Sequence, residues 1–116
     1  MVEELLDVNG AIAFDQGKAR VSLDLRIYRL TAIQKTTYRF AREFGAILGP
    51  IDGDVLNATL EFPPAMPDAQ VNRLLRSFFE DLLDQELRER IAEETHALRA
   101  LVLAQAFSMT DLIRRD

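Results

Sequence analysis

The sequence has 116 residues, of which 48% are hydrophobic and 28% charged, and its formal net charge is −5. These values are typical of a single domain, 1–116, with its own hydrophobic core, and they argue against intrinsic disorder. The chain has no cysteine and one histidine, which excludes disulfides, iron–sulfur clusters, thiol nucleophiles and multi-histidine metal sites. Basic residues are interleaved with acidic ones, so we expect no binding to nucleic acid.

The N-terminal residues carry no targeting pattern. They begin Met-Val-Glu-Glu, whereas a secretory signal needs a basic start and an apolar run of about 7 to 15 residues. No stretch reaches the roughly 18 apolar residues that a membrane span requires. We therefore expect a cytoplasmic protein that does not enter a membrane, with residues 1–10 frayed.

Residues 11–62 show the order strand, strand, helix, hairpin. Residues 19–26 alternate apolar and polar side chains, which predicts a half-buried strand that pairs with the short apolar run at 11–14. Thr31 and Gln34 have capping-box spacing, so a helix is predicted to begin at Thr31. Gly45 is predicted to end that helix in the left-handed conformation.

The predicted hairpin turns at Asp52-Gly53, a dipeptide typical of tight turns between apolar runs. Its return strand alternates, with an inner face of Leu56, Ala58, Leu60 and Phe62 and an outer face of Asn57, Thr59 and Glu61. Pro63-Pro64 ends the strand because proline cannot donate to a ladder.

Residues 67–107 contain neither glycine nor proline after Pro67, and their apolar spacing predicts helix. Glu86 and Arg90 form an acid-to-base pair at i, i+4, which is typical of an exposed helix face. One helix of this length would span roughly 60 Å, so we expect a break near Thr95 and a tail at 108–116. Without a break, a second chain would have to cover the apolar stripe. The predicted fold is α+β, a small antiparallel or mixed sheet packed on one face by helices.

Few residues could carry chemistry. His96 could act as a general base or a single metal ligand, but no serine or cysteine nucleophile is coupled to it in the sequence. Asp52 and Asp54 lack the further oxygen ligands of a calcium loop, because Leu56 and Ala58 follow. The acidic cluster Glu89, Glu93 and Glu94 has no Glu-x-x-His partner motif, and it is typical of a solvated helix face. We expect a non-catalytic binding protein without a metal or other cofactor.

Two segments carry a resemblance to a known family. The first reads Tyr-x-Leu-x-Ala-Ile-x-Lys over 28–35 with Tyr-x-Phe at 38–40, and the second is the helical run over 82–107. Together they resemble the HxsD family, the small D protein of the His-Xaa-Ser peptide-modification system, over about residues 21–108. The family occurs beside radical S-adenosylmethionine enzymes and a precursor peptide with His-Xaa-Ser repeats. The resemblance implies an accessory protein, and no catalytic residue is attached to the family motif that could be carried over to this chain.

Two surfaces follow as candidates. Asn57, Thr59 and Glu61 face away from the predicted core and could contact a precursor peptide added along the sheet. Alternatively, Leu98, Leu101 and Val102 could dock on a radical S-adenosylmethionine maturase or a second copy of the chain. Other classes stay open. One is a structural homodimer built on an unbroken helix or a general protein-interaction module with no peptide substrate, and another is a small enzyme that places His96 beside acidic residues in a cleft.

Overall fold

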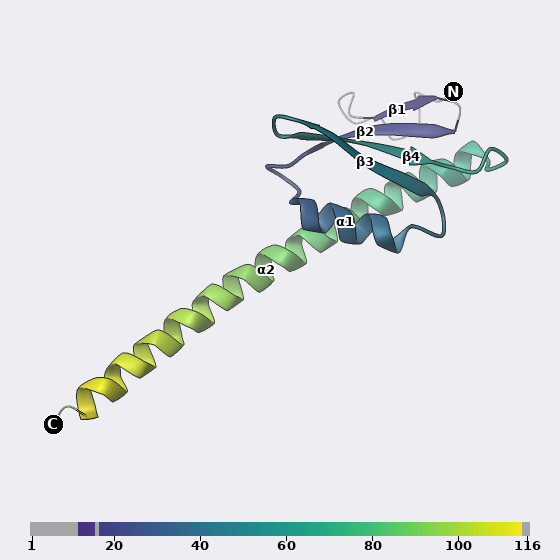
Figure 1. Ribbon diagram of the computed structural model, residues 1–116. Coiled ribbons are helices and arrows are strands. Elements are labelled where there is room, and N and C mark those ends of the chain that lie inside the picture. Colours follow the sequence, from purple (N-terminus) through teal and green to yellow (C-terminus); the bar gives the residue numbers. More distant parts are fainter. Residues whose placement is uncertain (1–11, 16, 115–116) are drawn as a thin grey trace. The chain divides into compact units, whose positions relative to one another are not determined.

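The computed structural model describes residues 12–15 and 17–114, with side chains to residue 108. Four strands and two helices follow in the order β1 (Ile12–Asp15), β2 (Lys18–Asp24), α1 (Leu30–Arg39), β3 (Gly45–Asp52), β4 (Val55–Glu61) and α2 (Asp68–Arg114) (Figure 1). The chain divides into two units, 1–86 and 87–116. The first holds the sheet, α1 and the first turns of α2, and the second holds the remainder of α2.

The sheet is antiparallel throughout and its strand order is β1-β2-β4-β3. Gly17, with φ of 79°, lies in the turn between β1 and β2, and Gly53, with φ of 63°, lies in the turn between β3 and β4. Both hairpins were predicted from the sequence. The pairing of β2 with β4 joins them, placing Val21 opposite Ala58 and Leu23 opposite Leu56.

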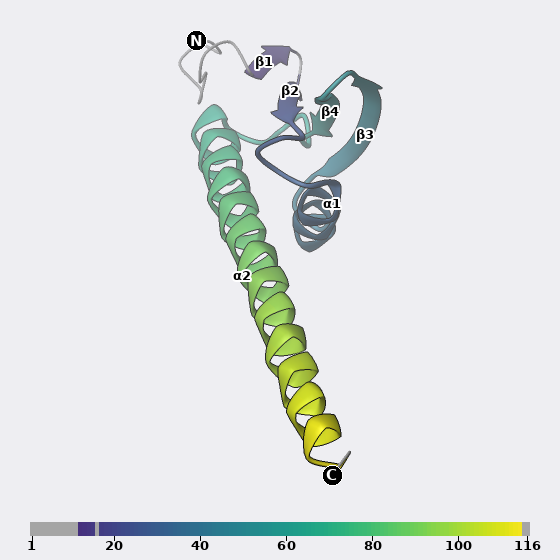
Figure 2. The ribbon, with the colours of Figure 1, turned by 90° about the vertical axis from the view of Figure 1, so that its left-hand side faces the viewer.

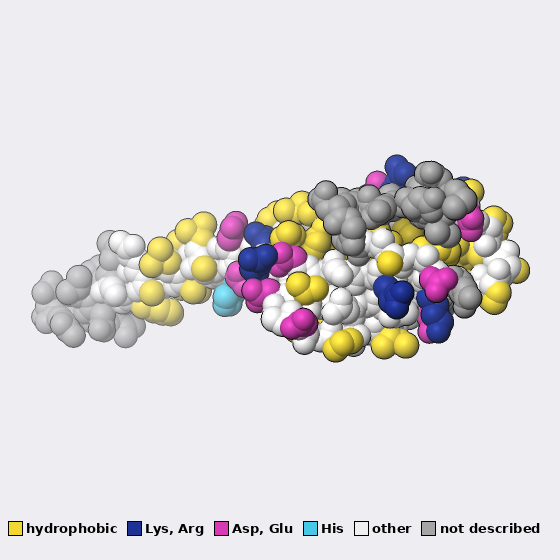
Figure 3. Space-filling model, turned by 90° about the horizontal axis from the view of Figure 1, so that it is seen from above, with side chains coloured by type: hydrophobic (Ala, Val, Ile, Leu, Met, Phe, Trp, Pro, Cys, Tyr) yellow, Lys and Arg dark blue, Asp and Glu magenta, His cyan; other side chains and the backbone are white. Residues whose placement is uncertain are grey.

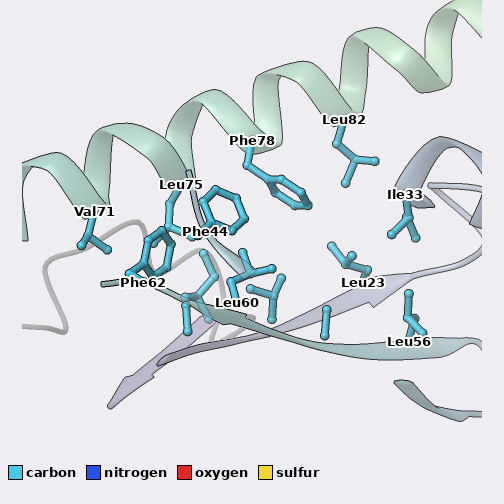
Figure 4. Close-up of a cluster of buried hydrophobic side chains, with 14 of the residues drawn as sticks. Leu23, Ile33, Phe44, Leu56, Leu60, Phe62, Val71, Leu75, Phe78 and Leu82 are labelled. Carbon is cyan, nitrogen blue, oxygen red and sulfur yellow. The ribbon is translucent and has the colours of Figure 1, made fainter. Parts of the chain in front are cut away.

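The core lies between one face of the sheet and the two helices (Figure 4). The predicted inner face of β4 is confirmed, since each of its four residues is buried. From α2 come four fully buried side chains at helical spacing: Val71, Leu75, Phe78 and Leu82. Phenylalanine rings meet in this core: the Phe44 ring centroid lies 4.8 Å from that of Phe62 and 6.0 Å from that of Phe78.

Helix α1 starts differently from the prediction. Its N-cap is Arg29, which makes no side-chain cap hydrogen bond, and Thr31 lies within the first turn. The Arg29 backbone N–H instead donates to Glu86 Oε1 of α2 at 2.9 Å. The helix ends at Arg39, and Gly45 begins β3 without a positive φ. A carboxylate from a distant part of the sequence therefore accepts the backbone N–H of the N-cap residue, which is the role that the capping-box prediction gave to Gln34.

The predicted break near Thr95 is wrong. Helix α2 runs from Asp68 to Arg114 as one element, so the helix also continues through most of the expected tail at 108–116. No glycine or proline interrupts it, and a threonine in a helix interior costs only about 0.7 kcal/mol or less relative to alanine. The expected fraying of residues 1–10 lies outside the described residues.

Candidate binding surfaces

The chemistry-bearing residues do not gather into a site. His96 is exposed on α2, and the described residues include no group of three or more His, Asp or Glu side chains that could hold a metal ion. Asp52 ends β3 and Asp54 lies in the hairpin turn, as the hairpin interpretation predicts. Glu93 and Glu94 are exposed on α2. Within the described residues, no helix is long and apolar enough to cross a membrane.

The outer face of the sheet carries the three residues predicted to contact a peptide. Asn57 and Thr59 are half-buried and Glu61 is exposed. Ser22 Oγ donates to Asn57 Oδ1 at 3.3 Å, Asn57 Nδ2 donates to the Pro50 carbonyl at 3.4 Å, and Lys18 Nζ lies 3.7 Å from Glu61 Oε2. These contacts hold the side chains in place across three strands.

A hollow of about 260 Å³ lies on this face, lined by Asp15, Lys18, Arg20 and Thr59. It therefore offers two cationic groups, one carboxylate and one hydroxyl to a ligand. Of the three predicted contact residues only Thr59 lines it, and Lys18 is also the ion-pair partner of Glu61.

Strand β4 lies inside the sheet and not at its edge. It pairs with β2 on one side and with β3 on the other, so its backbone groups are engaged in two ladders. A peptide strand therefore cannot add directly beside the backbone of Asn57, Thr59 and Glu61, contrary to our prediction. An added strand needs an edge, which these residues' own backbone does not offer, although their side chains remain on an accessible face.

The edge on that side is β3, which pairs with no other described strand than β4 (Figure 2). Ile47 of β3 lies directly opposite Thr59 on the outer face, and 57% of its surface is exposed. The register shifts between Leu48 and Ile51, so the regular part of this edge is Gly45 to Leu48. The sequence showed a short apolar strand here but gave no sign that it was an edge.

The second unit is an apolar stretch of helix. Between His96 and Ser108 the only charged residue is Arg99 and the only amide is Gln105. Figure 3 shows hydrophobic side chains along this stretch. The large ones are all at least half exposed: Leu98 62%, Leu101 64%, Val102 58%, Leu103 50% and Phe107 71%. The three residues predicted as an interface are thus part of a larger apolar surface, which we call the C-terminal apolar segment, residues 97–107.

These side chains surround the helix instead of forming one stripe. At about 100° per residue, Leu103 lies roughly 140° around the axis from Leu98. Leu98, Leu101 and Val102 fall on one side, whereas Leu103 and Phe107 fall on the other. A helix that is apolar all round is normally buried, so this segment differs from the solvated helix surface between Asp84 and Glu94.

Two carboxylates, Glu86 and Asp24, accept several hydrogen bonds within the first unit. Glu86 is 3% exposed and accepts from Arg29 twice, through the backbone N–H at 2.9 Å and through Nε at 3.2 Å. The interpretation of Glu86 as part of an exposed face is therefore wrong. The sequence contained a signal for this, because Glu86 follows Leu82 at i+4 on the buried stripe.

The other group is Asp24, at the end of β2. Its carboxylate accepts from Arg26 Nε at 3.0 Å, from Arg26 Nη2 at 2.8 Å and from the Arg26 backbone N–H at 2.9 Å. These hydrogen bonds lower the pKa of Asp24 from 3.8 to about 2. The pair fixes the turn that leads from the sheet into α1.

Comparison with known protein families identifies the family of this chain. A family described as "His-Xaa-Ser system protein HxsD" matches residues 23–113. The chain belongs to the HxsD family. The match spans β2 to α2, and therefore includes both the β3 edge and the C-terminal apolar segment of this HxsD family member. No curated protein and no solved structure matches the chain.

Proposed function

We propose that this HxsD family member is a non-catalytic accessory protein of a ribosomally made peptide-modification system, and that it works by docking on the radical S-adenosylmethionine maturase. The observation that carries this proposal is the C-terminal apolar segment, 97–107, with five large apolar side chains each at least half exposed. Membership of a His-Xaa-Ser system family supports a role among the proteins of that system.

The distribution of the apolar side chains favours a groove as the docking site. Pairing with one other helix would cover a single stripe, and would leave either Leu98 and Val102 or Leu103 and Phe107 in water. A groove between two or more helices of a larger partner can cover both sides of the segment. Helix-in-groove recognition uses anchors of this kind, spaced along one short helical stretch.

The proposal assigns the chemistry to the partner. The chain has no cysteine for an iron–sulfur cluster, and the alternative of an enzyme built on His96 gains no support, because this residue is exposed on a helix instead of lying in a cleft. Binding both enzyme and peptide would raise the local peptide concentration at the maturase.

A second activity, binding of the precursor peptide, is favoured by the outer face of the sheet. The hollow lined by Asp15, Lys18, Arg20 and Thr59 presents both charges and a hydroxyl. Asn57, Thr59 and Glu61 remain our proposed side-chain contacts on this face. The two activities use different units, so each can be removed separately.

The test is isothermal calorimetry of the protein against the purified maturase. The double variant Leu98→Glu, Val102→Glu should weaken binding by at least about tenfold, because two charges would have to enter an apolar groove. The matched control is Leu83→Glu, on α2 within the first unit, where the leucine is 49% exposed, and it should bind like the parent.

Two outcomes contradict the proposal. Equal binding by the double variant and the parent would show that the C-terminal apolar segment is not the docking surface. Alternatively, sedimentation velocity could detect a stable homodimer that the double variant abolishes, while the parent fails to bind the maturase. That result would favour the structural homodimer.

A further inference from the structure

The first half of the β3 edge, Gly45 to Leu48, carries none of the devices that normally keep an edge from accepting another strand. Natural edges are protected by charged side chains, proline or bulges. In β3 the first charged residue is Asp52, and both Pro50 and the register shift lie in its second half. The first half, Gly45 to Leu48, is regular, uncharged and free of proline.

The side chains of this half-strand define two different environments. Ala46 and Leu48 face inward, opposite Leu60 and Ala58, and pack partly buried against the core. Ile47 faces outward beside Thr59 with more than half of its surface exposed. A strand laid along this edge would therefore meet apolar groups on both of its faces.

Helix α1 contributes further side chains to the inward-facing side of the β3 edge. Arg39 donates through Nε to Asp81 Oδ2 at 3.0 Å, which identifies the flank of α1 that faces α2. The opposite flank, roughly 160° around the helix, lies on the β3 side of the sheet (Figure 2). Its residues are uncharged and spaced at helical intervals: Leu30, Gln34 and Thr37.

We propose that the β3 edge at Gly45–Leu48 binds an extended peptide by strand addition, and that the peptide presents three successive aliphatic residues opposite Ala46, Ile47 and Leu48. Main-chain hydrogen bonds would supply affinity and the alternating side chains would supply specificity. This inference rests on the proposed peptide-binding role. It places the principal contact with the peptide at the edge of β3 instead of the outer face of β4.

Interface size favours a peptide over a second copy of the chain. A stable protein–protein interface uses about 20 to 30 residues a side. The regular edge offers four residues and one uncharged flank of α1, and the bulge after Leu48 ends the ladder that two identical strands would share. A peptide needs only this short edge, because one extended chain contacts both faces at once.

The probes are overlapping 15-residue fluorescent peptides that tile the precursor peptide, with binding to the full-length protein followed by fluorescence anisotropy. Ile47→Lys places on the edge the charge that natural edges use for protection, and it should weaken the best peptide by about tenfold or more. Ile27→Lys is the matched control, since Ile27 is 51% exposed in the turn after β2, and it should bind within about twofold.

Backbone methylation of the peptide separates strand addition from side-chain binding. Methylating one peptide nitrogen at a time should abolish binding at alternate positions only, because every second N–H of an added strand points to the sheet. Tolerance at every position, equal binding by both lysine variants or no binding of any peptide would overturn the inference. A homodimer that Ile47→Lys dissociates would also overturn it, by assigning the edge to a second copy. Maturase binding by the C-terminal apolar segment is measured independently, so either proposal can fail alone.

Discussion

Replacing Glu86 by alanine tests how α1 is held on the core. Glu86 is almost completely buried, and its two oxygens accept the Arg29 backbone N–H and the Arg29 Nε. The variant would leave the N–H at the start of α1 without this acceptor, and the guanidinium without this carboxylate. Two elements far apart in sequence are joined by this one side chain.

The expected loss of unfolding free energy is about 1.5 to 3 kcal/mol. Breaking a fully buried ion pair costs about 3 to 5 kcal/mol, but the Arg29 side chain is 32% exposed, so water compensates part of the loss. A hydrogen bond to a charged group contributes about 1.5 to 3 kcal/mol on its own. The lower end of this range is the smallest loss of unfolding free energy that we expect for Glu86→Ala. Glu86→Gln keeps an acceptor for the Arg29 N–H, and we expect it to lose about 1 kcal/mol.

Urea unfolding monitored by tyrosine fluorescence measures these changes in the first unit. Tyr28 packs partly buried against the core, whereas Tyr38 is 83% exposed and should respond little. The control is Glu80→Ala, an exposed glutamate on the same helix, which should change stability by less than about 0.5 kcal/mol. The reasoning is refuted if Glu86→Ala is as small as this control.

Three further predictions concern other residues. Truncation after Glu94 should leave the urea midpoint of the first unit unchanged, because all the core residues that the structure describes as buried precede residue 87, and should abolish maturase binding; a lower midpoint would contradict this. Thr37→Val should stabilise the protein by up to about 1 kcal/mol, since Thr37 Oγ1 is buried without a hydrogen-bond partner. The neighbouring Thr36→Val should destabilise it, because Thr36 Oγ1 accepts from Arg39; equal effects in thermal melts would refute the distinction. Asp24 has a pKa lowered to about 2 from 3.8, so the stability it contributes is present above about pH 4 and is lost as the pH falls through about 2. Carbon-detected NMR titration should show this pKa, and Arg26→Gln should return it toward 3.8.

Local patterns in the sequence predicted most of the elements. The alternation in β4 gave its buried face, and the dipeptide Asp52-Gly53 gave the second hairpin, because both depend on neighbouring residues alone. The order of strands depends on the pairing of β2 with β4, which joins residues more than thirty positions apart. No local pattern encodes that pairing, so the sequence did not reveal that β3 would be an edge and β4 an interior strand.

The two errors in the helices have different physical causes. A break near Thr95 was expected because a long helix exceeds the width of a small domain, but nothing in the local sequence stops the helix there. Glu86 was interpreted from its spacing to Arg90, although its spacing to Leu82 placed it on the buried stripe. The local sequence determined the first outcome, and the tertiary contact between Glu86 and Arg29 determined the second. The apolar character of Leu98, Leu101 and Val102 was visible in the sequence, whereas the exposure of Phe107 was not.

The continuity of α2 has a thermodynamic consequence for the C-terminal apolar segment. Starting a helix is unfavourable by a factor of roughly a thousand, whereas adding a residue to an existing helix is close to neutral. Because Val71, Leu75, Phe78 and Leu82 are buried in the core of the first unit, the turns that follow need only propagate. The exposed turns are thus templated by a nucleus that folding has already formed. Hydrogen exchange should accelerate progressively along α2 toward Arg114, and a partner that binds near Phe107 would reverse that gradient without having to initiate a helix.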